Sequence, residues 1–243
     1  MNLLVLGNSD TRGKFAPGPT WTQVARERLS AADPGLVFAE RGFSPIGDSA
    51  TAYVERFLAE YRPDMVVLPL GTFAFTVGFT WPRIQRLLGR RIAARYRRAE
   101  EAFDTRTRPT GTPPGRLNTL VRKSARRVVG TQPILSRAAL EAAYTRVLDA
   151  LARLEDLDVL LVAYPAERGR LVKVRRIAEE RQRFLDTIAT IAARRHFRLL
   201  DSAPLFAGRE DEDEIMTADG FHLERAGHAL LGEAVAAALS ARG

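Results

Sequence analysis

Three polar residues have the types and spacing of a hydrolytic triad. Ser9 follows the apolar run Leu3 to Leu6 and lies in the stretch LGNSDTRG, residues 6–13. Asp219 and His222 are three positions apart, ahead of an apolar-periodic segment, so one turn can place the carboxylate against the ring. An imidazole held by a carboxylate can take the proton of a serine hydroxyl and make its oxygen nucleophilic. These residues therefore predict acyl transfer through a serine.

A second serine competes for the nucleophile's role. Ser49 lies in IGDSAT, residues 46–51, whose letters resemble those around Ser9. The preceding stretch RGFSP contains a proline and gives no buried strand that could end in a sharp turn. We therefore interpret Ser49 as a residue at the start of a helix, with Asp48 near the cap, and Ser9 as the nucleophile.

Composition argues against most other chemistries. The chain of 243 residues has no cysteine, which excludes disulfides, a thiol nucleophile and cysteine-ligated metal. It has three histidines without ligand spacing, so we expect no metal. We interpret His196 and His228 as structural, since one precedes a predicted strand and the other lies inside the last predicted helix. No phosphate-binding loop or dinucleotide fingerprint is present, so we expect no cofactor.

The elements that must position these residues alternate along the chain. Short apolar runs separated by helical patterns are typical of a parallel sheet with helices on both faces. The predicted strands are residues 3–6, 36–39, 65–68, 159–163 and 197–200, and the predicted helices are about 20–32, 49–61, 136–154, 173–195 and 226–240. The fold class expected is α/β, a flavodoxin-like three-layer α/β/α sandwich with a five-stranded parallel sheet. Ligands of such folds bind at the carboxyl ends of the strands, and Ser9, Gly42 and Gly71 follow three of these ends.

One basic segment interrupts this alternation. Residues 83–131 hold 14 Arg and Lys against three acids, a net charge of +11, which leaves −3 for the rest of a chain whose total is +8. We expect one domain, residues 1–243, with this segment as a helical insertion. It can serve as a lid or recognise an anionic substrate, an acidic carrier protein or an anionic membrane surface. Nucleic acid is disfavoured, because aromatic platforms and a helix-turn-helix are missing from the pattern.

Aromatic residues alternate with smaller ones in GTFAFTVGFTW, residues 71–81. One interpretation is an extended strand that buries one face. The other is an apolar wall for an acyl or aromatic group, in which Phe73, Phe75 and Phe79 line the substrate pocket.

Four short blocks of the sequence together resemble the SGNH/GDSL hydrolase family. Gly7-Asn8-Ser9 is similar to the family's Gly-Asp-Ser, and Gly42 in ERGFSPIG is similar to its glycine after the second strand. Gly71-Thr72-Phe73 partly matches Gly-x-Asn, and Asp219 to His222 matches Asp-x-x-His. The resemblance covers roughly residues 1–75 and 132–241.

The resemblance implies roles for individual residues. Ser9 would be the nucleophile, His222 the general base and acid, and Asp219 the residue that orients the imidazole. The backbone N–H groups of Ser9 and Gly42 would form an oxyanion hole, which stabilises the charge that develops on the acyl oxygen.

The sequence departs from the family's pattern at two positions. Asn8 stands in place of the aspartate before the serine, and Phe73 stands in place of an oxyanion-hole asparagine. Either Thr72, Asn8 or another group then supplies the missing donor, or turnover is slow, or the chemistry differs.

These observations predict an esterase that forms an acyl-enzyme. The substrate expected is a small-molecule ester or acyl compound, anionic or carrier-bound in one interpretation. No stretch approaches the roughly 20 apolar residues of a membrane span, and no leader pattern is present, so we expect a cytoplasmic protein. Two alternatives are an acyltransferase or cyclase of the same fold, and a binding protein that kept the fold but lost turnover.

Overall fold

The computed structural model describes residues 1–7, 11, 18–47, 49–71, 77–79, 89, 131–133, 136–164, 175–208, 215–216 and 222–241. These residues form two compact units, one made of residues 1–75 and 135–243 and the other of residues 76–134.

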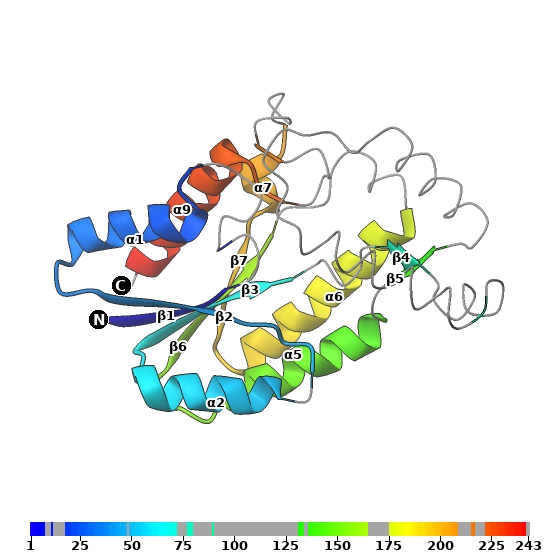
Figure 1. The fold of residues 1–243 in the computed structure, drawn as a ribbon, viewed down its shortest axis with the longest axis horizontal. Helices are drawn as coiled ribbons and strands as arrows, with labels where there is room; N and C mark the ends of the chain where they lie inside the picture. The colour runs from blue at the N-terminus through cyan, green and yellow to red at the C-terminus, as the bar shows by residue number, and fades with distance from the viewer. Residues whose placement is uncertain are drawn as a thin grey trace. The chain divides into compact units, whose positions relative to one another are not determined.

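A five-stranded parallel sheet forms the centre of the first unit (Figure 1). Its strands lie in the order β2-β1-β3-β6-β7. The strands are β1 (Asn2–Gly7), β2 (Val37–Gly42), β3 (Met65–Leu70), β6 (Asp158–Ala163) and β7 (Arg198–Asp201). The three inner strands are almost wholly apolar, which is expected of strands that are covered on both faces.

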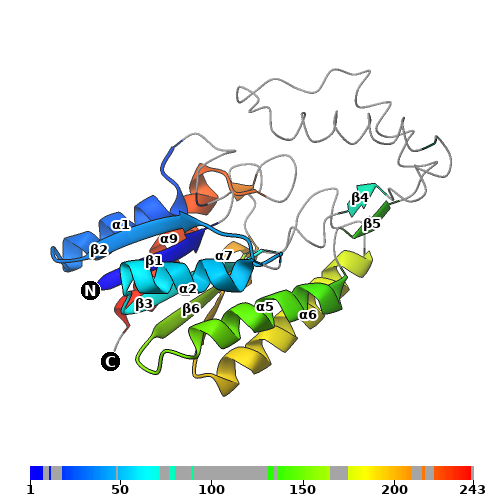
Figure 2. The same cartoon turned by 60° about the horizontal axis from the view of Figure 1, so that its bottom comes forward.

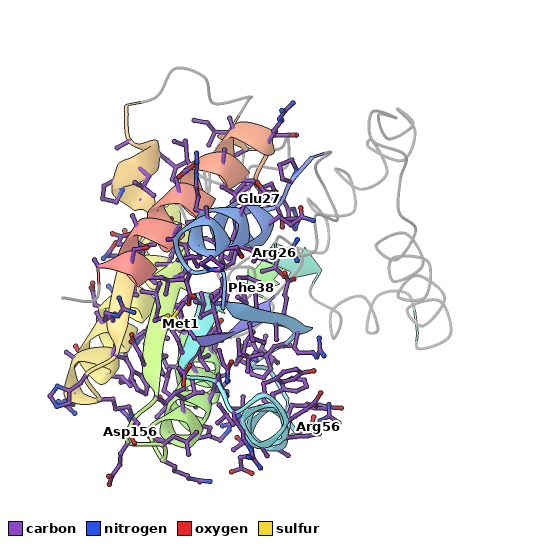
Figure 3. The ribbon with its side chains drawn as sticks, turned by 90° about the vertical axis from the view of Figure 1, so that its left-hand side faces the viewer. Met1, Arg26, Glu27, Phe38, Arg56 and Asp156 are labelled. Carbon is purple, nitrogen blue, oxygen red and sulfur yellow. The ribbon has the colours of Figure 1, made fainter. Side chains whose placement is uncertain are left out.

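Helices cover both faces of this sheet (Figures 1 and 2). One face carries α1 (Trp21–Ala32) and α9 (Arg225–Ser240), with the short α7 (Ala203–Phe206) beside α9. The other face carries α2 (Ala50–Tyr61), α5 (Arg137–Leu151) and α6 (Arg175–Arg194). Figure 3 shows the layers edge-on, with α1 and α9 on one side of the strands and α2 on the other.

Alternate strand residues supply the two halves of the core. Leu3, Val5 and Val67 pack in one buried cluster with Trp21 of α1 and Leu231 of α9. Their neighbours along each strand point to the opposite face, because successive side chains of a strand alternate. Full burial of each such side chain contributes about 1.5–3 kcal/mol to folding.

Gly232 brings the two helices on the first face close together. A Cβ at this position would lie 2.6 Å from Cβ of Val24 and 2.7 Å from the carbonyl oxygen of Trp21. An exposed ion pair between Arg28 and Glu233 spans the same two helices at 2.6 Å. Helix α1 is therefore held against the middle of α9.

The second unit begins and ends in an antiparallel pair. Strand β4 (Val77–Phe79) pairs with β5 (Thr131–Pro133), with Val77 opposite Pro133 and Phe79 opposite Thr131. Its basic residues and the helices predicted for it lie outside the described residues.

The structure confirms the predicted fold class. All five predicted strands form, and each lies within three residues of its expected bounds. Thr20 caps α1, the helix expected from about residue 20: its side chain accepts from the Gln23 N–H at 3.3 Å, and its own N–H donates to the Gln23 side chain at 2.8 Å. The helices expected at 136–154 and 173–195 are shorter, at Arg137–Leu151 and Arg175–Arg194.

Candidate active site

The strands that precede Ser9 and contain Gly42 end side by side. Gly7 and Gly42, the last residues of β1 and β2, are register partners. The N–H of Phe43 donates to the carbonyl oxygen of Gly7 at 2.7 Å, so the pairing continues to the end of both strands. Ser9 is two positions after Gly7 in the sequence.

Gly7 allows the chain to return against the end of β1. A Cβ at Gly7 would lie 2.1 Å from Oγ1 of Thr11, a separation that no real side chain adopts. Thr11 is 2% exposed, and its carbonyl oxygen accepts a hydrogen bond from the Thr22 hydroxyl at 3.3 Å. The hydroxyl of Thr22 is also 2.8 Å from that of Thr20. Both ends of the connection that contains Ser9 are therefore fixed, one to β1 and the other to the start of α1.

The residues on either side of the segment that contains Asp219 and His222 pair with each other. Met216 and Leu223 form an isolated antiparallel bridge, and the N–H of Glu224 donates to the carbonyl oxygen of Ile215 at 2.8 Å. Gly227 makes this approach possible, since a Cβ there would lie 2.2 Å from the same carbonyl oxygen. His222 is half-buried just before α9. The fold thus fixes the backbone on both sides of residues 217–222.

His228, in the first turn of α9, lies in the protein interior. It is 3% exposed, and its Nδ1 accepts a hydrogen bond from the backbone N–H of Trp21 at 3.2 Å. Burial, together with the smaller effect of the nearby charge of His222, lowers the pKa of His228 to about 4. His228 is therefore neutral near pH 7, with its proton on Nε2.

Tyr144 of α5 holds the end of β3. Its buried hydroxyl accepts from the N–H of Gly71 at 2.6 Å and donates to the carbonyl oxygen of Pro69 at 3.2 Å. Burial raises the pKa of the Tyr144 hydroxyl, so it stays protonated and can keep both bonds. The backbone that leads into Thr72 is thereby fixed.

Further polar contacts follow at the end of β6. The Tyr164 hydroxyl accepts from the indole N–H of Trp21 at 3.0 Å, and the guanidinium of the buried Arg181 donates to the Tyr164 carbonyl oxygen. The hydroxyl of Ser202 donates to the carbonyl oxygen of Ala163 at 2.6 Å. Trp21 thus connects α1 with both α9 and the end of β6.

The structure describes only part of the predicted site. It places Gly42 at the exposed end of β2 and His222 before α9. Phe79 is the last residue of β4, and its side chain is not described. The remaining predicted site residues, Asn8, Ser9, Thr72, Phe73, Phe75 and Asp219, lie outside the described residues, as does Asp48. Among the side chains that are described, no group of three or more His, Asp or Glu could hold a metal.

Sequence reasoning missed the residues that support the site. Trp21, Thr11 and Tyr144 read as ordinary helix or loop residues, because their contacts join segments far apart in the chain. The burial of His228 agrees with its interpretation as a structural residue. Ser49 directly precedes α2, as expected, but its side chain makes no capping hydrogen bond.

Fold and site together define a class of protein. A five-stranded parallel α/β sandwich with Ser9 after the first strand and an Asp-x-x-His segment before the last helix is the arrangement of an SGNH-type hydrolase. The sequence profile of the GDSL-like lipase/acylhydrolase family matches residues 5–230. The chain belongs to this family.

Solved structures of esterases and lipases share the fold. A lipase/acylhydrolase from Enterococcus faecalis superposes with a TM-score of 0.57 at 14% identity, over 99% of this chain and 95% of that one. An alanine variant of Axe2, an acetylxylan esterase from Geobacillus stearothermophilus, gives 0.59 at 16%, over 96% and 91%. TesA gives 0.53 at 19%, over 98% of both chains. No curated protein matches the sequence.

None of the helices within the described residues is both long and apolar enough to cross a membrane.

Proposed function

We propose that this protein is a serine hydrolase that cleaves an ester through an acyl-enzyme intermediate. The observation that carries the proposal is the hydrogen bond between Trp21 and His228, at 3.2 Å. It ties the start of α1, to which the segment after β1 is bonded, to the helix that follows His222. The bond supports the proposal, because the elements that it joins, α1 and α9, are the next elements along the chain after the proposed nucleophile and the proposed base.

The proposed reaction proceeds in two acyl transfers. The hydroxyl oxygen of Ser9 attacks the ester carbonyl carbon while His222 takes the proton. The tetrahedral intermediate collapses, the carbon–oxygen bond to the alcohol breaks, and the leaving oxygen takes the proton from His222. Water then attacks the acyl-enzyme with His222 again as the base, and Ser9 recovers its proton. Asp219 orients the imidazole and stabilises its charged form.

Two backbone groups and one further donor form the proposed oxyanion hole. The N–H groups of Ser9 and Gly42 donate to the carbonyl oxygen as it gains charge. The register of Gly7 with Gly42 supports this pairing, because it places both strand ends at the same level. Thr72 or Asn8 provides the third donor, since Phe73 has no side-chain hydrogen to donate.

Catalytic variants of a structural neighbour support the same assignment. Structures of Axe2 in which alanine replaces a serine, an aspartate or a histidine are described as catalytic mutants. The aspartate and the histidine are three positions apart in Axe2, as are Asp219 and His222 here. An acyl group on an alcohol oxygen is therefore the substrate class to test first.

Hydrolysis of 4-nitrophenyl acetate, butyrate and octanoate by matched serine variants tests the proposal. Ser9→Ala and His222→Ala should each lower kcat by about a thousandfold or more. Ser49→Ala is the control and should keep the wild-type rate. Turnover that survives both of the first two substitutions would defeat the mechanism. Loss of turnover in Ser49→Ala, with Ser9→Ala active, would assign the nucleophile to the other serine.

A transferase is separated from a hydrolase by its products. The same assay with an added alcohol or amine acceptor should still release mainly the free acid. Dominant transfer to the acceptor would make the protein an acyltransferase of this fold. A wild type that neither turns over nor becomes acylated by any ester would indicate a binding protein.

A further inference from the structure

A buried polar link joins the segments on which the proposed nucleophile and base lie. Trp21 is the first residue of α1, and its N–H is one of the amides that a helix cannot bond within itself. The acceptor is Nδ1 of His228, 207 positions further along the chain. Both residues are buried, at 0% and 3% exposed. Because the buried N–H of Trp21 is shielded from water, it needs this acceptor. Loss of the hydrogen bond would therefore lower the stability of the fold.

The Trp21 end of the link leads to the segment after β1. The neighbouring residue, Thr22, donates to the carbonyl oxygen of Thr11 at 3.3 Å. Thr11 in turn lies directly against Gly7, the last residue of β1. A displacement of the α1 start therefore displaces one end of the segment that contains Ser9.

The His228 end of the link leads to the proposed base. His228 is six positions after His222, and its own N–H donates to the carbonyl oxygen of Glu224 at 2.8 Å. The two histidines are near enough for the charge of His222 to act on His228. A displacement of the first turn of α9 therefore displaces His222.

We propose that His228 is a positioning residue for the reaction, acting through its Nδ1 acceptor. The bond to Trp21 sets the spacing between the α1 start and the first turn of α9, and with it the spacing between Ser9 and His222. His228 needs no contact with substrate for this role. The proposal rests on the proposed function, because Ser9 and His222 are the groups that it positions.

Three substitutions separate the hydrogen bond from simple packing. The Oδ1 of an asparagine branches from Cγ, as Nδ1 of histidine does, so His228→Asn can keep an acceptor for Trp21. His228→Gln is also polar, but its acceptor lies one bond further from the backbone. His228→Leu keeps the branching and has no acceptor. Each variant is assayed for kcat, KM and the midpoint of urea unfolding near pH 7.5, with Ser9→Ala beside them.

We expect His228→Leu and His228→Gln to lower kcat by about tenfold to a hundredfold, because small misplacements of catalytic groups have effects of this size. KM should stay within about twofold of the wild-type value, since a positioning residue does not bind substrate. His228→Asn should recover most of kcat. If His228→Leu does not fold, the comparison of Asn with Gln decides.

Two results would overturn the positioning role. One is a folded Leu or Gln variant with wild-type kcat, and the other is an Asn variant as impaired as Gln at equal stability. If either result is found and Ser9→Ala is inactive, the positioning role is wrong but the serine mechanism is still supported. An active Ser9→Ala overturns the proposed function, and the positioning role with it.

Discussion

Gly7 and Gly42 end two neighbouring parallel strands as register partners, and the Gly7 carbonyl oxygen accepts the N–H of the residue after Gly42 at 2.7 Å. This pairing places the start of the Ser9 segment beside the glycine whose N–H is proposed to stabilise the oxyanion. The sheet supports this pairing, because strands β1 and β3 are apolar and are buried on both faces. The rigid sheet thus sets the position of groups that the loops present.

Gly7→Ala should disturb the site more than any glycine change in a turn. The new methyl group would lie 2.1 Å from Oγ1 of Thr11, so either β1 or the segment after it must shift. We expect a loss of about 1–3 kcal/mol in the free energy of unfolding, together with a fall in kcat. Urea unfolding and ester hydrolysis measure the two effects. Gly35→Ala is the control, since its Cβ would meet only the Asp33 carboxylate, at 3.3 Å. Equal losses of stability and of kcat in Gly7→Ala and Gly35→Ala would show that the site does not need a glycine at position 7.

Tyr144→Phe should destabilise the end of β3. The change removes one hydroxyl and leaves the Gly71 N–H and the Pro69 carbonyl oxygen buried without that partner. A cost of about 1–3 kcal/mol is expected from urea unfolding. Tyr53→Phe provides the comparison, because Tyr53 is 45% exposed and should change stability by less than about 0.5 kcal/mol. Similar losses in both variants would show that the buried hydroxyl has no special role.

The unfolding free energy should fall in mild acid because of His228. Its pKa is about 4 in the folded protein against 6.5 ordinarily, so below pH 6.5 the unfolded chain binds a proton that the folded state excludes. The contribution to stability is complete above pH 6.5, declines as the pH falls towards about 4, and then levels off. The full decline is about 3 kcal/mol.

Paired unfolding curves isolate this effect. His228→Asn has no titrating side chain at this position, so its stability should depend less on pH than that of the wild type between about pH 6.5 and 4. Other titrating groups contribute to both proteins and cancel in the difference. An identical pH dependence in the two proteins would show that His228 does not remain neutral in the fold.

Phe73→Asn should raise the rate of ester hydrolysis. A side-chain amide at this position could donate to the oxyanion, and one such donor is worth up to about a hundredfold to a thousandfold in kcat. Phe73→Leu is the matched control, since it removes the aromatic ring and adds no donor. The two variants are compared by kcat on the same 4-nitrophenyl ester. A rise in neither, or in both, would show that an amide at position 73 does not donate to the oxyanion.

The sheet and its helices could be predicted because their signals are local. Apolar runs such as Met65 to Leu68 mark buried strands, and the Thr20 and Gln23 pair marks a helix start within four residues of sequence. The alternation of strands and helices gives the parallel α/β class and the hand of the crossovers, but it does not by itself fix the order of the strands. The candidate triad residues could be chosen because each lies in a short block with its own signal: Ser9 follows an apolar run, and Asp219 is three positions before His222.

The contacts beneath the site could not be predicted, because they join residues distant in the chain. Nothing around Trp21 indicates that its N–H needs His228, and nothing around Tyr144 points to Gly71. Gly227 reads as an unfavourable helix residue until the carbonyl oxygen of Ile215 is seen against it. Such requirements appear only when packing brings the elements together.

The central claim is that Ser9 is a nucleophile activated by His222, and covalent labelling tests it most directly. The protein is treated with a fluorophosphonate, digested and analysed by mass spectrometry. We predict one adduct, on the peptide that contains Ser9, which is absent in Ser9→Ala and strongly reduced in His222→Ala. An adduct on Ser49 instead, or an active wild type that acquires no adduct at Ser9, would contradict the claim.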